Sequence, residues 1–274
     1  MLIAQITDLH IGAGRRLAYR KVDTAGALEN AVRHVMALDP RPDIVLFTGD
    51  IGDLGTAEEY GLVRDILRGL TIPYYMVPGN HDRREPLRTA FPQAIPVTAD
   101  QPFLQYVIDD FPVRLIGLDT LDEGMPGGKL CAARLDWLRH ELAIATDRPR
   151  LIFMHHPPVL TGIRHMDVQN LGDGADELGG LLRKSDGVIG LICGHVHRAI
   201  HCVWQGVPIS IGPSVAHQVA LDVRPDGPSA FIMEPPAMHL HFWSPQQGLM
   251  THTSYIGHFD GPYPFFDENG NLIV

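Results

Sequence analysis

Five apolar stretches of this 274-residue sequence read as buried strands, and each is followed within a few residues by side chains that can bind a metal ion. These fragments are Asp8-Leu9-His10, Gly49-Asp50, Gly79-Asn80-His81-Asp82, His155-His156 and Gly194-His195-Val196-His197. In an open α/β sheet the carboxyl ends of the strands open into one crevice, so loops at that edge can converge. The pattern therefore favours a fold that brings five distant loops to one sheet edge.

The first two thirds of the sequence alternate between strand and helix. Strands are predicted at residues 2–7, 43–48 and 72–77, and helices at residues 24–38 and from Thr56, where Glu59 completes a capping box. This order predicts a sheet with parallel strands covered by helices. Two further runs, 103–109 and 113–119, predict a hairpin.

From Ala199 the pattern changes to shorter strands interrupted by Gly and Pro, which indicates a second, mainly β sheet. We expect a catalytic domain over residues 1–225. Residues 226–274 are expected to form a β-rich extension packed on that domain, and their aromatic side chains could supply a subunit contact. Packing of those aromatic side chains on their own domain is an equally good reading.

Composition narrows the class of partner. The formal net charge is −10, and no run of Lys and Arg suited to a phosphate backbone is present, so we expect no nucleic-acid polymer as partner. No apolar stretch approaches the roughly 18 residues of a membrane span, and we expect no membrane partner. The three cysteines are an odd number in a sequence that opens on a predicted strand, so we expect reduced thiols and a cytoplasmic protein.

The five fragments offer carboxylate, amide and imidazole ligands. This mixture suits two neighbouring divalent or trivalent cations and is compatible with Fe, Mn, Zn or Co. Taken singly, the Asp8 and Asn80 fragments would be ordinary turns. The pair His195 and His197 is more specific, because residues two apart in an extended segment face the same side. Together the fragments indicate a binuclear metal hydrolase.

The fragments as a set resemble the motifs of the calcineurin-like metallophosphoesterases. Their flanks, notably residues 154–158 and the tail segments 261–262 and 266–269, resemble the bacterial glycerophosphodiesterase and class III cyclic-nucleotide phosphodiesterase branch. The resemblance covers nearly the whole sequence. It implies an α/β fold, a four-layer αββα sandwich of two mixed sheets flanked by helices, with the metals at its edge and a small β-rich C-terminal cap or contact region.

The resemblance also implies roles for individual residues. One metal would be bound by Asp8, His10, Asp50 and His197, and the other by Asp50, Asn80, His156 and His195. Asp50 would bridge the two ions and take part in catalysis. The substrate would contact Asn80, His81 and His217, with His81 as the catalytic hydrogen-bond donor or general acid. His155 is expected to alternate away from the site, as a structural or supporting residue.

These roles predict a phosphodiesterase for small diesters, either glycerophosphodiesters or 3′,5′-cyclic nucleotides. A water activated by the two metals would attack phosphorus and release a phosphomonoester. A phosphomonoesterase, a nuclease on the same scaffold and a non-catalytic binding scaffold are the alternatives, although a nuclease should show a basic stripe and a scaffold should lack ligands. His239 and His241, which alternate in a strand-like segment, give weak support for a third metal. We also expect a homo-oligomer, a dimer or larger.

Overall fold

The computed structural model describes residues 1–273, and its centre is a pair of mixed sheets. The first sheet has five strands in the order β13-β12-β1-β2-β3. These are β1 (Leu2–Ile6), β2 (Ile44–Phe47), β3 (Tyr74–Met76), β12 (Ala237–Ser244) and β13 (Gly248–Tyr255). β1, β2 and β3 run parallel, whereas β12 pairs antiparallel with both β1 and β13.

The second sheet has six strands in the order β4-β5-β6-β7-β9-β8. These are β4 (Tyr106–Ile108), β5 (Arg114–Gly117), β6 (Arg150–Phe153), β7 (Val188–Cys193), β8 (Ile200–Trp204) and β9 (Val207–Ile211). A separate short ribbon pairs β10 (Gln218–Val219) with β11 (Phe231–Ile232). The predicted hairpin is present as the antiparallel pair of β4 and β5.

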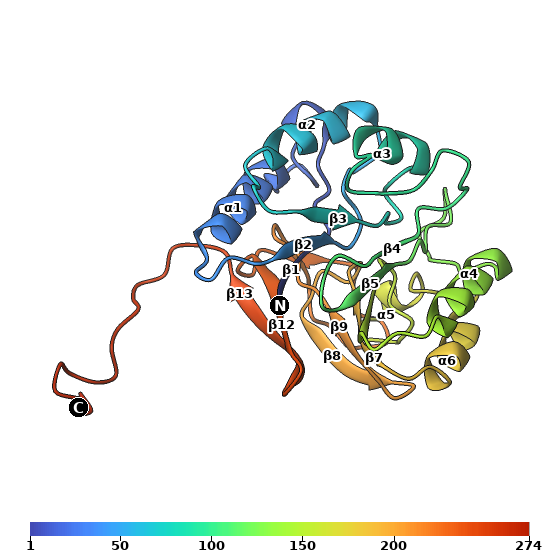
Figure 1. Ribbon diagram of the computed structural model, residues 1–274. Coiled ribbons are helices and arrows are strands. Elements are labelled where there is room, and N and C mark those ends of the chain that lie inside the picture. Colours follow the sequence, from blue (N-terminus) through green and yellow to red (C-terminus); the bar gives the residue numbers. More distant parts are fainter. Residues whose placement is uncertain (274) are drawn as a thin grey trace.

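Helices cover the outer face of each sheet (Figure 1). The first sheet is covered by α1 (Thr24–Ala37), α2 (Ala57–Leu67) and α3 (Arg84–Ala90), and a short 3₁₀ helix, η1 (Ala13–Arg15), packs on α2. The second is covered by α4 (Ala132–Ala143) and α6 (Ala175–Arg183), and the short helix α5 (Arg164–Asp167) lies in the connection between β6 and α6. The capping box of Thr56 and Glu59 opens α2 as predicted.

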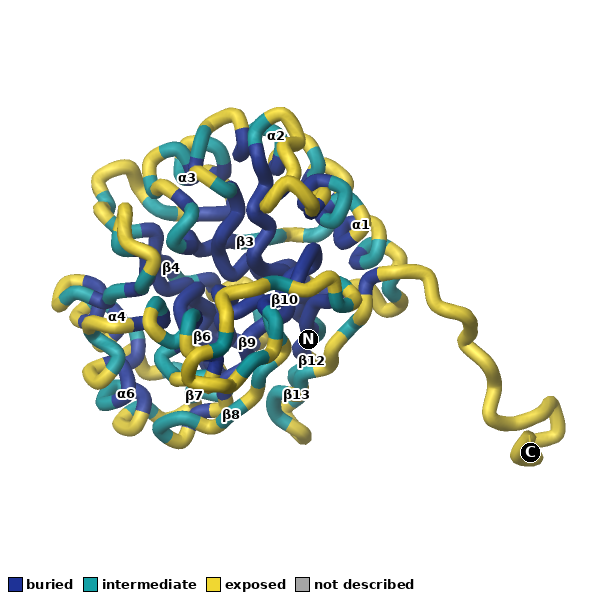
Figure 2. Tube along the Cα trace, turned by 180° about the vertical axis from the view of Figure 1, so that it is seen from behind, coloured by how far each residue is buried: buried dark blue, intermediate teal, exposed yellow. Residues whose placement is uncertain are grey.

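The main hydrophobic core joins the facing sides of the two sheets. Ile6 and Phe47 of the first sheet belong to the same buried cluster as Leu115 and Phe153 of the second. A second cluster packs α4 and α6 against the outer face of the second sheet. In Figure 2 this buried interior lies along the strands, and exposed backbone follows the outer helices. The fold is thus the expected four-layer αββα sandwich.

The C-terminal third differs from the sequence-based expectation. β8 and β9 extend the second sheet beside β7, and β12 lies inside the first sheet beside β1, so residues after Ala199 form no sheet of their own except the β10–β11 ribbon. Alternation of polar and apolar residues predicts strands but not their partners, which tertiary packing decides. Both strands of the predicted extension, β12 and β13, thus belong to the first sheet. The segment from residue 257 to 273 leaves the body as an exposed tail (Figure 1).

Candidate metal centre

Backbone geometry at the carboxyl ends of β1, β2 and β7 is unusual at the residues expected to bind metals. Five of them adopt a left-handed conformation with positive φ, which costs free energy for residues other than glycine: Asp8 at 56°, His10 at 46°, Asp50 at 53°, His195 at 73° and His197 at 50°. Hydrogen bonds between loops hold this arrangement. The N–H groups of Leu9 and His10 donate to the carbonyl of Asp50 at 2.9 and 3.0 Å.

One group of side chains gathers around Asp8. His10 Nε2 lies 3.1 Å from His197 Nε2 and 3.5 Å from a carboxylate oxygen of Asp50. His197 Nε2 lies 3.4 Å from an oxygen of Asp8, whose carboxylate also accepts the backbone N–H of His195 at 3.1 Å. All of these side chains are buried. The structure therefore brings together the four residues expected for the first metal.

A second group adjoins the first at Asp50. Asn80 Oδ1 lies 3.1 Å from His195 Nδ1 and 3.1 Å from His155 Nε2. His155 Nε2 is in turn 3.4 Å from a carboxylate oxygen of Asp50 and 3.3 Å from His195 Nδ1. Asp50 thus stands between the two groups, as a bridging carboxylate would.

The position of His155 differs from the expectation that its side chain points away from the site. β6 ends at Phe153, so strand alternation no longer fixes the direction of the two histidines that follow. His155 reaches across to the first sheet, where its Nδ1 hydrogen-bonds the carbonyl of Thr48 at 2.7 Å. His156 bonds Thr120 Oγ1 through Nδ1 at 2.8 Å, and its buried Nε2 has no hydrogen-bond partner among the described residues.

His81 and His217 border the same centre. His81 Nδ1 lies 2.8 Å from the backbone carbonyl of Asp53, so this nitrogen carries the proton in the neutral ring and Nε2 is left to exchange protons. The backbone N–H of His81 donates to Asp50 Oδ1 at 2.9 Å. The His217 ring centre is 4.8 Å from that of His197 and 6.1 Å from that of His10.

The electrostatics of the cluster favour a cation at its centre. Burial raises the pKa of Asp8 to about 6. Burial acts to lower the pKa of His155, but the charges of Asp50 and Asp8 and a hydrogen bond outweigh it and raise that pKa to about 9. For His195 and His197, burial and neighbouring histidines leave the pKa well below its usual value. These two rings are therefore neutral at pH 7, the state in which imidazole binds a metal.

The donor set fits metal ions in its chemistry and its spacing. The ligand atoms of Asp8, His10 and His197 all lie within 4.8 Å of one another, as do those of Asp8, Asp50 and His155. His155, His156 and His195 form a third such group. Imidazole nitrogens facing carboxylate oxygens suit Zn, Mn, Fe or Co, and the ligand types do not select among these metals.

A cavity of about 370 Å³ adjoins the candidate metal centre. Its lining includes Asp50, Asn80, His81 and His217, and its outer wall carries Tyr19 and Phe231, whose rings stack with centres 5.0 Å apart. Sequence reasoning missed these two aromatic residues, because they belong to segments without a motif. Only the fold brings the loop after η1 and β11 together.

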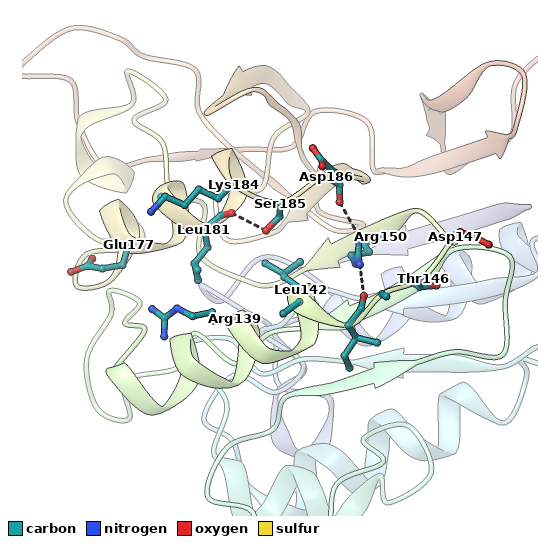
Figure 3. Close-up of a pocket in the computed structure, with 14 residues that line it drawn as sticks. Arg139, Leu142, Thr146, Asp147, Arg150, Glu177, Leu181, Lys184, Ser185 and Asp186 are labelled. Atoms are coloured by element: carbon teal, nitrogen blue, oxygen red, sulfur yellow. Dashed lines mark hydrogen bonds between the residues drawn. The ribbon is translucent and has the colours of Figure 1, made fainter.

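A larger hollow, of about 910 Å³, lies between α4 and α6 at the opposite ends of β6 and β7 (Figure 3). Its Arg150 guanidinium is held between the carbonyls of Ile144 and Asp186 at 2.7 and 2.8 Å. The groups of potential metal ligands found in residues 1–273 all lie elsewhere. Size alone does not make this hollow the functional site.

Comparison with known proteins agrees with this geometry. Residues 1–199 match the family described as calcineurin-like phosphoesterase. The whole chain is 48% identical over 273 residues to a probable glycerophosphodiester phosphodiesterase of Arcobacter nitrofigilis, with all of both chains covered. It is 30% identical over 216 residues to the 3′,5′-cyclic adenosine monophosphate phosphodiesterase of Vibrio vulnificus, covering 79% of this chain and 77% of the relative.

Among solved structures, a dimetal phosphatase from Danio rerio has a similar fold, with a TM-score of 0.64 and 16% identity over 94% of this chain and 99% of that one. In the described part of the chain, no helix combines the length and apolar content needed to cross a bilayer. The family match covers well over half of the sequence, and the first relative is matched from end to end. The chain belongs to the calcineurin-like phosphoesterase family.

Proposed function

We propose that this protein is a binuclear metal-dependent phosphodiesterase that hydrolyses small phosphodiesters to phosphomonoesters. One observation carries the proposal: loops from both sheets gather two carboxylates, an amide and four imidazoles around Asp50, with contacts of 3.1 to 3.4 Å between neighbouring ligand atoms. The relatives named as glycerophosphodiester and cyclic-nucleotide phosphodiesterases support the same chemical class.

The proposed ligand sets follow the contacts. Asp8, His10, Asp50 and His197 would hold one metal, and Asp50, Asn80, His156 and His195 the other, with His155 beside the second set. Thr120 fixes the Nδ1 of His156, and its buried Nε2 has no hydrogen-bond partner among the described residues, as a metal ligand would. His155 Nε2 faces Asp50 and Asn80 and is a further candidate ligand. The Nδ1 of His155 is occupied by the Thr48 carbonyl, which fixes the ring so that Nε2 points at the site.

When bound, two adjacent metal ions supply an acidic water and neutralise the charge of a phosphate. His81 lines the cavity beside the cluster, where a proton on its Nε2 would be given to the leaving alkoxide. The Asp53 carbonyl keeps the ring in place through Nδ1. Asp50 also holds the backbone of His81 in place, because its carboxylate accepts the His81 N–H.

The shape and lining of the cavity support a small substrate. It holds about 370 Å³, and its lining has histidines and a single carboxylate, Asp50, but neither Lys nor Arg among the described residues. A nucleic-acid strand would need a row of cations along its backbone. Glycerophosphodiesters and cyclic nucleotides both fit this description, and a phosphomonoesterase is the second candidate because the metal ligands alone do not distinguish the two reactions.

A substrate panel tests the proposal. Manganese-reconstituted protein should hydrolyse bis(4-nitrophenyl) phosphate faster than 4-nitrophenyl phosphate, and should act on at least one of glycerophosphocholine, glycerophosphoethanolamine and cyclic AMP. A preference for the monoester would replace the diesterase assignment. Full activity after exhaustive chelation would remove the metal mechanism altogether.

We further propose a homo-oligomer that works in the cytoplasm. The tail after β13 exposes Phe259, Tyr263, Phe265 and Phe266, and such an apolar segment suits burial against a second copy. Free thiols at all three cysteines fit a reducing compartment. Sedimentation of the wild type and a Phe265→Ser/Phe266→Ser variant tests the oligomer, which should dissociate in the variant.

A further inference from the structure

The two loops that share the Asp50 site touch each other at their backbones. A Cβ added to Gly79 would lie 2.1 Å from Asp50 Oδ1 and 2.4 Å from the Asp50 nitrogen, so only glycine permits this approach. Asp50 itself is held at a φ of 53°. Close packing of a strained residue requires further interactions to keep it in place.

Asp82 supplies these interactions. Its carboxylate is 3% exposed and accepts the N–H of Gly79 at 2.9 Å within its own loop. It also accepts the N–H groups of Ile51 and Gly52 at 3.1 Å, from the loop that carries Asp50. Carboxylates that accept several N–H bonds are strong, directional anchors. Asp82 therefore joins the loop of Asn80 to the loop of Asp50.

The linkage between the loops is reciprocal. Asp50 Oδ1 accepts the N–H of His81 at 2.9 Å, in the loop that Asp82 belongs to. Each loop thus contributes one aspartate that binds the backbone of the other loop. The loop of Asp50 cannot shift relative to the loop of Asn80 without breaking hydrogen bonds of both aspartates.

Helix α2 supports the same junction from outside. The Tyr60 hydroxyl donates to Asp82 Oδ1 at 2.9 Å and accepts the N–H of Arg83 at 3.1 Å. Tyr60 is fully buried, and its ring lies edge-on to Phe91 at the end of α3. The orientation of the Asp82 carboxylate is therefore fixed by the core and not by solvent.

We propose that Asp82 is a positioning residue that sets the separation between Asp50 and Asn80 and, through it, the affinity of the second metal. This rests on the metal pair of the proposed function. Asp82 is outside both proposed ligand sets and does not line the 370 Å³ cavity. Partners of this kind change metal affinity or activity by about 10- to 100-fold when replaced.

The test compares Asp82→Asn with a matched control, Asp119→Asn. The asparagine amide in the first variant would turn an NH₂ group toward backbone donors while the side-chain volume stays the same. Asp119 is also fully buried, and its carboxylate accepts hydrogen bonds from Arg84 and from the N–H groups of Leu104 and Leu121, not from the loops of Asp50 and Asn80. Both variants lose a buried, multiply bonded carboxylate, so loss of stability is common to both.

Manganese binding is measured by calorimetric titration and elemental analysis, and the coupling between the two ions by electron paramagnetic resonance. Asp82→Asn should weaken one of the two sites by about 10- to 100-fold and reduce the signal of the coupled pair. Asp119→Asn should leave both affinities near the wild-type values even where its melting temperature falls. Equal losses in the two variants, or two wild-type affinities in Asp82→Asn, would overturn the proposal.

A milder variant covers the case in which Asp82→Asn fails to fold. Tyr60→Phe removes one of the hydrogen bonds to Asp82 and should weaken the same site to a smaller extent, whereas unchanged binding would count against the proposal. None of these measurements uses turnover. A wild-type protein that binds two ions but cleaves no diester would overturn the proposed function and leave the role of Asp82 standing.

Discussion

Two groups of buried histidines in this protein have the same side chains and different surroundings. In the metal centre, His10 and His155 face the carboxylates of Asp50 and Asp8, and their pKa values are raised despite burial. On β12, His239 and His241 are equally buried, but they face neutral groups. His239 bonds Ser210, and His241 bonds Thr251 and Gln5.

The difference shows what turns a histidine cluster into a candidate metal site. Burial lowers the pKa of His239 to about 3 and that of His241 well below its usual value, so both rings are neutral at pH 7. Hydroxyl and amide partners satisfy these rings without attracting a cation. These contacts give no support to a third metal at His239 and His241. The histidines of the metal centre differ because carboxylates from neighbouring loops face them.

The largest effect is expected from removing the carboxylate that both groups of ligands share. Asp50→Ala should empty at least one metal site and abolish diester turnover, because both groups of ligands meet at Asp50. His241→Ala, which removes a histidine of the second cluster, should keep the metal content of the wild type. Elemental analysis of both proteins decides the question, and retention of two ions in Asp50→Ala would disprove the bridging role.

Replacing the two adjacent histidines one at a time tests the ligands of the second metal. His155→Ala should lose about one of the two ions, since His155 Nε2 faces Asp50 and Asn80. His156→Ala should also lose about one ion, because Thr120 fixes its Nδ1 and leaves its buried Nε2 free for a metal. Metal titration of the two variants gives the answer, and retention of both ions in His156→Ala would exclude His156 from the ligand set.

A third variant separates catalysis from metal binding within the first cluster. His81→Ala should slow diester turnover by roughly 100- to 10,000-fold, the usual cost of losing a general acid. Its metal content should equal that of the wild type, because His81 is outside both proposed ligand sets. Its ring bonds the backbone carbonyl of Asp53. Steady-state kinetics with saturating manganese provide the measurement, and undiminished turnover would exclude the acid role.

The smallest expected effect concerns acid stability and the second cluster. His239 is neutral in the folded state with a pKa of about 3, and an unfolded histidine titrates near 6.5. Its contribution to stability is fully present above that pH and is lost as pH falls toward 3. Between pH 7 and pH 5 the loss is about 2 kcal/mol. Urea unfolding of the wild type and His239→Gln should show a shallower pH dependence in the variant, and identical slopes would refute this role.

Much of the fold and of the candidate site could be predicted because the relevant signals are local. The apolar runs before Asp8 and Asp50 and the capping box at Thr56 predict strands and a helix with nearly correct ends. Parallel strands with intervening helices then imply that the loops meet at one edge. The convergence of Asp8, His10, Asn80, His195 and His197 follows from that rule.

Other features depend on contacts between distant segments. Sequence patterns place β12 in a C-terminal extension, whereas the structure pairs it with β1 at the other end of the sequence, a partner that no local pattern encodes. His155 lies beyond the end of β6, where the direction of its side chain is set by the carbonyl of Thr48 in the other sheet. The stacked pair of Tyr19 and Phe231 likewise arises only from folding.

The amino-acid order alone determined which residue types stand at the strand ends, and hence the hydrolytic metal chemistry that the chain can support. Periodicity and capping are short-range properties, so they are readable without a structure. The tertiary structure decided which histidine faces Asp50, how Asp82 joins the two loops, and which walls enclose the cavity. These depend on contacts between distant segments, such as Asp8 and His195, which are 187 positions apart, and no local pattern encodes such contacts.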